Sequence, residues 1–226
     1  MVRRGSLRRL GVDHLDVLYL HQPDGETPLS ETLSAVAGLQ ADGLVGELGV
    51  SNFAAWQIAR VEQVCDQVGC ARPVLAQQVY NLLARRIEDE YAGFARESGL
   101  ATVVYNPLAG GLLVAPLGAD GPGGSRFSTS RLATMYRGRY LTEPMVRAVR
   151  GLAELAADAG LSRVELALRW VDGQEVTTGV LLGASRPEQL GESLDALARG
   201  PLPQDVLDRC DAVVADVRGA MPAYNR

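Results

Sequence analysis

Apolar and polar positions along the chain form a regular succession of short apolar runs and longer amphipathic stretches. The short runs have the length of buried strands, and the longer stretches repeat apolar residues every three or four positions, as helices do. Because the two kinds of segment alternate, we expect parallel βαβ units with right-handed crossovers. Predicted strands cover 14–21, 45–50, 74–78, 101–105 and 177–182, and predicted helices cover 5–10, 29–42, 54–68, 86–98, 143–159, 162–171 and about 203–217.

Residues that cap or interrupt helices divide this pattern further. Thr27 or Ser30 is expected near the cap of the helix that follows, and Ser185 is expected to cap a helix with Pro187 in its first turn. The segment 114–142 is rich in Gly, Pro, Ser and Arg and has no periodicity. It is expected to be a long irregular loop, either a binding loop or disordered.

Polar or small residues stand at the carboxyl end of every predicted strand. In a (β/α) barrel this end of the strands carries the ligand site. The pattern therefore predicts an α/β fold of barrel type with about five parallel strands, outer helices and a ligand site at one end. The residues at these ends are His21, Ser51, Asn52, Gln77, Tyr105, Asn106 and the run 183–185.

Composition and charge narrow the classes of function. The chain has 226 residues and a net charge of −5 without a basic cluster, which argues against nucleic acid as a partner. It has no apolar run long enough to cross a membrane and no signal peptide, so a cytoplasmic protein is expected. The three cysteines lack metal-ligand spacing, and no metal site is predicted. All 22 basic residues are arginine, which excludes lysine chemistry within this sequence.

Five segments, in order and at matching spacing, resemble those of the aldo-keto reductase family. The resemblance runs from about Ser6 to Arg199 and corresponds to the carboxyl-terminal two thirds of such a reductase. It implies a partial TIM-type barrel. The segments are Ser6–Asp13 with Leu18–His21, Gly49–Phe53, Gln77–Leu82, Tyr105–Leu112 and Gly183–Gln189.

The resemblance also implies roles for individual residues. His21 matches the histidine that hydrogen-bonds the substrate carbonyl. Ser51, Asn52 and Gln77 match the residues that hold the nicotinamide carboxamide of NADP(H), and Tyr105 matches the aromatic residue that stacks on the nicotinamide ring. Hydride transfer requires the ring to be fixed in this way.

The remaining cofactor residues implied by the resemblance lie further along the chain. The turn from Asn106 through Leu108 to Gly110 matches the pyrophosphate loop, and Ser185 and Arg186 are candidates for the 2′-phosphate. A helix amino terminus after a strand suits a phosphate group. The residues that match the adenosine site are Gly183, Ser185, Gln189 and Glu192.

The sequence also departs from the family pattern. The aspartate, tyrosine and lysine that accompany the histidine in the family have no counterpart before His21, which predicts a single truncated domain over 1–226 with an incomplete catalytic tetrad. Ser193 stands where asparagine is common, and 114–116 replaces a Gly-Lys pair, so NADP(H) binding is expected to be weakened or lost. An incomplete barrel exposes strand edges, which predicts a homo-oligomer or a partner chain that covers the opening.

Three functions remain open after this comparison, and catalysis itself is undecided. The first is NADP(H)-linked reduction of a small carbonyl substrate, with the missing proton donor supplied by a substituted residue, a partner chain or a longer form of the protein. The second is a non-redox cyclase, dehydratase or lyase acting on a small organic molecule, with His21 as acid or base. The third is a binding protein without catalysis.

Overall fold

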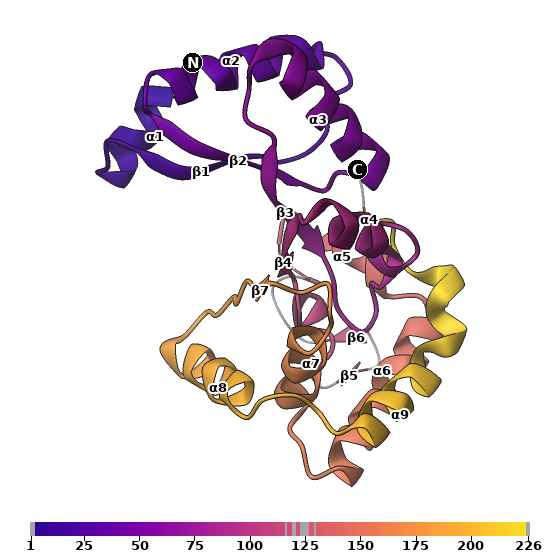
Figure 1. Ribbon diagram of the computed structural model, residues 1–226. Coiled ribbons are helices and arrows are strands. Elements are labelled where there is room, and N and C mark those ends of the chain that lie inside the picture. Colours follow the sequence, from indigo (N-terminus) through magenta and orange to yellow (C-terminus); the bar gives the residue numbers. More distant parts are fainter. Residues whose placement is uncertain (1–2, 116, 119–120, 123–126, 129, 225–226) are drawn as a thin grey trace. The chain divides into compact units, whose positions relative to one another are not determined.

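The computed structural model describes residues 3–115, 117–118, 121–122, 127–128 and 130–224 of the chain (Figure 1). Its main sheet contains five strands in the hydrogen-bonded order β1-β2-β3-β4-β7, with helices between successive strands. The strands are parallel, so the predicted fold class, a partial α/β barrel with outer helices, is confirmed. The five strands are β1 (Leu15–Leu20), β2 (Val45–Ser51), β3 (Pro73–Val79), β4 (Ala101–Tyr105) and β7 (Gly179–Val180).

The chain divides into two compact units, which are described separately. Unit 1 contains residues 1–78, 93–102 and 225–226, and unit 2 contains residues 79–92 and 103–224. Among the described elements, those that lie wholly or mostly in unit 1 are α1 (Arg3–Leu10), β1, α2 (Leu29–Ala41), β2, α3 (Ala55–Val68), β3 and α4 (Tyr91–Ser98).

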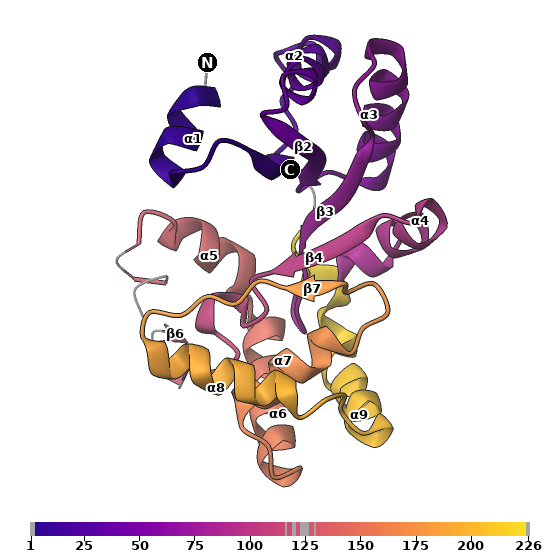
Figure 2. The ribbon, with the colours of Figure 1, turned by 60° about the vertical axis from the view of Figure 1, so that its left-hand side comes forward.

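The core of unit 1 forms where α2 and α3 pack on strands β1 to β3, with the two helices side by side (Figures 1 and 2). The apolar residues of both helices recur at helical spacing and face this core. In β1, by contrast, no residue is fully buried, although the strand is apolar at most positions. The buried apolar residues of the two helices include Leu33, Val36, Leu39, Ile58, Val61 and Val64.

Unit 2 is built mainly from helices of the carboxyl-terminal part of the chain. Helix α6 packs against α9, and α7 packs against α8 (Figure 2). A two-stranded antiparallel ribbon, β5 (Leu117–Gly118) with β6 (Gly121–Pro122), lies in this unit. The other elements that lie wholly or mostly in this unit are β4, β7, η1 (Arg86–Glu88), η2 (Ala109–Gly111), α5 (Ala133–Tyr140), α6 (Glu143–Asp158), α7 (Arg163–Asp172), α8 (Pro187–Ala198), α9 (Gln204–Val214) and η3 (Ala215–Ala220).

Three predictions about helices differ from the structure. The predicted helix 86–98 is divided into η1 and α4, and the Glu88 carboxylate pairs with Arg85 over 2.7 Å instead of facing solvent on one continuous helix. The segment 114–142, predicted to be irregular, contains helix α5. The predicted last helix, 203–217, ends as an α-helix at Val214 and continues as η3.

Neither α2 nor α8 has a side-chain cap bond, so the predicted cap at Ser185 is wrong, while Thr27 lies next to the N-cap of α2. Pro28 is the N-cap of α2, and the Asp24 carboxylate accepts hydrogen bonds from the backbone amides of Glu26 and Thr27. Arg186 is the N-cap of α8 and makes no side-chain cap bond. Ser185 instead donates its backbone amide to the Gln189 side chain over 2.9 Å.

Candidate functional site

In unit 1, three strands end at the same level of the sheet. Leu20 of β1 pairs with Val50 of β2, and Ser51 pairs with Gln77 of β3. Parallel pairing therefore brings together the polar residues that the sequence places after or at these ends. Of them, Ser51 is buried, Gln77 is half-buried, and His21 is exposed.

Asn52 connects these strand ends. Its φ angle of 63° places it in the left-handed region, where asparagine is tolerated better than most residues. Its backbone amide donates to the Gln77 oxygen over 3.2 Å, and its side-chain nitrogen donates to the His21 oxygen over 2.8 Å and to the Ser51 hydroxyl over 3.0 Å. Asn52 is 2% exposed, so these bonds lie away from water and hold three strand ends in one arrangement.

Below this level, a tyrosine lies over a glycine of the neighbouring strand. Tyr19 pairs with Gly49, and a Cβ atom added at Gly49 would lie 2.8 Å from two atoms of the Tyr19 ring. The Tyr19 hydroxyl is hydrogen-bonded to the side chain of Gln77 on β3. Burial raises the pKa of Tyr19. Gly49 thus leaves room for a ring that reaches toward Gln77 across the intervening strand.

In unit 2, the residues after β4 form a tight turn with several left-handed backbone positions. Positive φ angles occur at Asn106 (62°), Ala109 (50°), Gly110 (70°) and Gly111 (99°). The Asn106 side-chain oxygen accepts a hydrogen bond of 2.6 Å from the Gly110 amide, which closes the turn. We call residues 106–111 the glycine loop.

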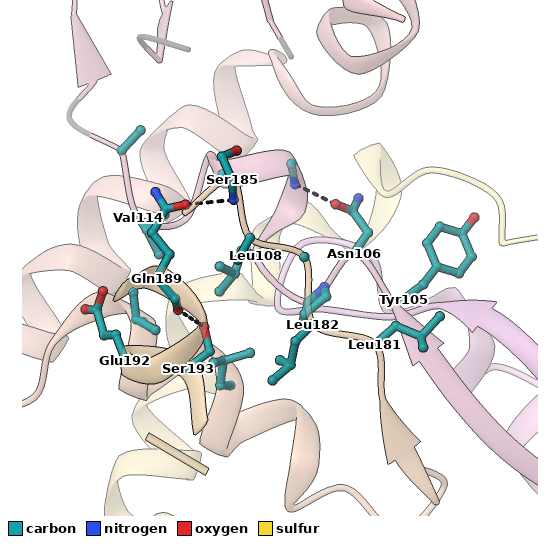
Figure 3. A pocket seen from close by; sticks show the side chains of 18 of the residues that line it. Tyr105, Asn106, Leu108, Val114, Leu181, Leu182, Ser185, Gln189, Glu192 and Ser193 are labelled. Carbon is teal, nitrogen blue, oxygen red and sulfur yellow. Dashed lines mark hydrogen bonds between the residues drawn. The ribbon is translucent and has the colours of Figure 1, made fainter. Parts of the chain in front are cut away.

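The glycine loop forms one wall of a cavity of about 660 Å³ within unit 2 (Figure 3). The opposite wall comes from the segment after β7 and from α8, where Gln189, Glu192 and Ser193 lie along the helix (Figure 3). Helix α8 begins at Pro187, and the positive end of a helix dipole is a favourable environment for an anion. Predicted cofactor residues that line the cavity are Tyr105, Asn106, Leu108, Gly110, Gly183, Ser185, Gln189 and Glu192.

Arg186 is the one predicted cofactor residue of unit 2 that is absent from this lining. It is exposed and directly follows Ser185 at the start of α8. The predicted residues of unit 1, which are His21, Ser51, Asn52 and Gln77, form the separate group described above.

Two aromatic residues of the cavity wall were missed by sequence reasoning. Phe127 and Tyr136 line the cavity, and their ring centroids are 5.6 Å apart. Both belong to the segment that the sequence predicts to be irregular, because glycine, serine and arginine dominate its composition. The recurrence of Phe127, Tyr136 and Tyr140 within that polar stretch is the signal that identifies a buried face.

Two other kinds of feature are absent from the described residues. No group of three or more His, Cys, Asp or Glu side chains is arranged to hold a metal ion. Over the same part of the chain, no helix combines the length and the apolar character needed to cross a membrane.

Comparison with known proteins gives one family. The model of the aldo/keto reductase family matches residues 3–215. An aldo-keto reductase of Pseudocercospora fijiensis is 36% identical over 210 residues, which are 89% of this chain and 71% of the relative.

Two further relatives have similar levels of identity. Aldo-keto reductase family 7 member A3 of Homo sapiens is 36% identical over 235 residues, covering 98% of this chain and 71% of that protein. A probable voltage-gated potassium channel subunit beta of Oryza sativa is 33% identical over 214 residues, covering 93% of this chain and 65% of that protein.

Proposed function

Because the chain belongs to the aldo-keto reductase family, we propose that it binds NADP(H) and serves the reduction of a small carbonyl compound. Membership of the family supports an oxidoreductase function. The observation that carries the finer proposal is the cavity in unit 2, which has the glycine loop on one side and the amino-terminal part of α8 on the other. A dinucleotide needs both features, a backbone that can approach its phosphates and a helix terminus that favours negative charge.

The glycine loop fits a diphosphate by its backbone. Gly110 and Gly111 have φ angles of 70° and 99°, which residues with a Cβ atom rarely adopt. No atom lies within 4 Å of a Cβ added at Gly111, so the backbone there is open to close approach. The amides of Ala109, Gly110 and Gly111 donate within the turn, so a phosphate oxygen would take another loop amide, such as that of Leu108.

The start of α8 would hold the adenosine end. Gln189 and Glu192 line the cavity and offer oxygen acceptors for hydroxyl and amino groups. Arg186, with an exposed planar guanidinium, would pair with a 2′-phosphate, and the Ser185 hydroxyl would assist it. This part of the proposal predicts a preference for NADPH over NADH.

The nicotinamide end is assigned to residues of unit 1 and to Tyr105. Ser51 and Asn52 would hold the carboxamide, in positions fixed by the hydrogen bonds from the Asn52 side-chain nitrogen to the His21 backbone oxygen and the Ser51 hydroxyl. Ser51 accepts from Asn52 and therefore keeps its own proton to donate to the carboxamide oxygen. The Tyr105 ring would stack on the nicotinamide face.

Bound NADPH supplies the hydride, and the chain must stabilise the negative charge that develops on the substrate oxygen. His21 is exposed at the end of β1, with its backbone oxygen fixed by Asn52. Its imidazole N–H would donate a hydrogen bond to that oxygen, which lowers the barrier when the donor is positioned in advance. His21 is thus the proposed catalytic residue of this chain.

Titration with NADPH, followed by its fluorescence, tests the cofactor assignment. We expect saturable binding that is tighter than NADH binding, and we expect Arg186→Ala to weaken NADPH binding roughly 10-fold while leaving NADH binding unchanged. Arg199→Ala, an exposed arginine beyond the end of the same helix, is the control. Absence of binding at millimolar NADPH contradicts the proposal.

A second candidate is a protein that binds the cofactor without turnover. One matched relative is named a channel subunit, and this sequence contains no lysine to tune a proton donor. NADPH binding combined with no NADPH oxidation over a panel of aldehydes and ketones would favour this candidate. Oxidation that falls at least 10-fold in His21→Ala would favour the reductase.

A further inference from the structure

The hydroxyl of Tyr140, at the end of α5, lies against the glycine loop. Tyr140 has 0% of its surface exposed. Its hydroxyl oxygen accepts hydrogen bonds from two side-chain amides, that of Asn106 over 2.8 Å and that of Asn81 over 3.2 Å. A single hydroxyl therefore joins a helix of the 114–142 segment to two residues that precede it by 34 and 59 positions.

Asn106 transmits this contact to the backbone of the loop. Its nitrogen donates to Tyr140, and its oxygen accepts the Gly110 amide over 2.6 Å. The nitrogen of this amide donates and its oxygen accepts. A 180° rotation of the amide would exchange the two atoms and break both hydrogen bonds. Tyr140 thus selects the orientation of Asn106 that closes the turn at Gly110.

Asn81 holds the same arrangement from the other side. It is fully buried and donates to the Asn106 backbone oxygen over 2.9 Å as well as to Tyr140. Its own oxygen accepts the Leu83 amide over 2.9 Å. The bonds from Asn81 to Tyr140 and from Leu83 to Asn81 are buried, and those of Asn106 are partly buried, so a lost partner costs more here than at the surface.

The rings of α5 also fit the loop closely. A Cβ atom added at Gly110 would lie 2.5 Å from the Tyr136 ring, so this ring rests directly on the glycine. Tyr136 and Tyr140 have ring centroids 6.2 Å apart, and both lie on one side of α5. The helix therefore supports the loop by apolar contact at Gly110 and by hydrogen bonds at Asn106.

We infer that Tyr140 is a positioning residue, whose hydroxyl holds the glycine loop in the shape that receives the diphosphate of the cofactor. This inference rests on the proposed function for the identity of the ligand. Tyr140 does not line the cavity itself, so it acts through Asn106 and Gly110.

The charge state of Tyr140 suits this role over a wide pH range. Burial raises the pKa of Tyr140 to about 12. The hydroxyl is therefore neutral under ordinary assay conditions, and the loop contact is independent of pH below about 10.

Tyr140→Phe tests the role, because it removes the hydroxyl and keeps the ring. The control is Tyr80→Phe, which removes a buried hydroxyl that bonds Glu88 over 2.6 Å and takes no part in the hydrogen bonds among Asn81, Asn106 and Tyr140. Two measurements are compared for the wild type and both variants: hydrogen exchange of peptides covering 106–112 without ligand, and binding of three ligands. The ligands are NADPH, 2′-phospho-ADP-ribose, which has the diphosphate but no nicotinamide, and adenosine 2′-monophosphate, which has neither.

We expect Tyr140→Phe to speed exchange in the loop peptides and to weaken NADPH and 2′-phospho-ADP-ribose roughly 3- to 10-fold, the value of one hydrogen bond. Adenosine 2′-monophosphate should bind equally to all three proteins. Unchanged exchange, unchanged diphosphate binding, or an equal loss for all three ligands overturns the role of Tyr140. If the wild type binds none of the ligands, the proposed function and the ligand assignment are both overturned. If the wild type binds them and Tyr140→Phe binds them equally well, only the role of Tyr140 is overturned.

Discussion

The side-chain nitrogen of Asn52 donates a 2.8 Å hydrogen bond to the backbone oxygen of His21, the residue that follows β1. The two residues are separated by 31 positions and lie at the ends of adjacent parallel strands. The bond fixes the backbone that carries the proposed catalytic imidazole.

Replacing Asn52 should separate the contribution of its side chain from that of its backbone conformation. Asn52→Gly keeps the positive φ angle without strain. It leaves the buried Ser51 hydroxyl and the His21 backbone oxygen without their donor, which should lower the free energy of unfolding by about 1–3 kcal/mol. Asn52→Ala should cost about 1–2 kcal/mol more, because a Cβ-bearing residue without a polar side chain disfavours φ near 63°. Urea unfolding measures both. Equal stability of the two variants would show that backbone strain is negligible.

Gly49→Ala should destabilise unit 1 by about 1–3 kcal/mol, since the new methyl group would meet the Tyr19 ring at 2.8 Å. Gly38→Ala is a matched control in the same unit. Gly38 lies inside α2 with no atom within 4 Å of an added Cβ, so this change should stabilise the protein by about 0.5–1 kcal/mol. Thermal or urea unfolding of both variants checks the prediction, and a neutral Gly49→Ala would show that Tyr19 moves aside freely.

Removing Arg85 should be costly, because its guanidinium has several partners in a largely buried place. Its guanidinium pairs with Glu88 at 2.7 Å and Asp211 at 2.6 Å and lies 4.9 Å from the centre of the Trp170 ring. The Arg85 side chain is only 16% exposed, so Arg85→Met leaves Glu88 in a largely buried position and should cost about 3 kcal/mol.

The control is an ion pair of the same type at the surface. Arg147 pairs with Glu143 at 2.5 Å, and both side chains are well exposed. Arg147→Met should change stability by less than about 0.5 kcal/mol. Similar losses for the two variants in urea unfolding would contradict the importance of burial.

The protein should lose stability as pH rises above about 9. Burial raises the pKa of Cys65 to about 12 and that of Cys210 to about 11, from an ordinary value of 9.0. Both thiols therefore keep their protons in the folded state at a pH where the unfolded chain releases them. Their contribution is fully present below pH 9 and is lost as pH rises through 11 to 12. At pH 10 each should cost about 1 kcal/mol.

Urea midpoints at pH 8 and pH 10 measure this loss. Cys210→Ala should have a smaller difference between the two midpoints than the wild type, whatever its absolute stability, because one of the thiols with a raised pKa is gone. An equal difference in the variant would show that Cys210 titrates alike in the folded and unfolded states.

Much of the fold could be predicted because its signal is local. The strand predicted at 45–50 is observed at Val45–Ser51, and the helix predicted at 54–68 is observed at Ala55–Val68. In both, apolar spacing matches the period of the element that forms. The prediction was poorer for 86–98 and 114–142, where side-chain contacts with distant elements decide the backbone.

The same distinction holds for the candidate site. Eight of the predicted cofactor residues line the cavity of unit 2, since polar and glycine residues at strand ends are visible in the sequence. Phe127 and Tyr136 were missed because their burial depends on the folding of α5 onto the glycine loop. At the start of α8 the Gln189 side chain accepts a hydrogen bond from the Ser185 backbone amide, in place of the predicted Ser185 cap. This bond likewise depends on side-chain packing.

By itself, the sequence determined the alternation of strands and helices, the family, and the polar residues at the strand ends. These follow from periodicity and residue type, which act over a few neighbouring positions. Only the tertiary structure decided that Tyr140 and Asn81 meet at Asn106, and that Asn52 holds His21. These hydrogen bonds join residues 25 to 34 positions apart. They form only when packing excludes water, so that each buried polar group must find its partner within the protein.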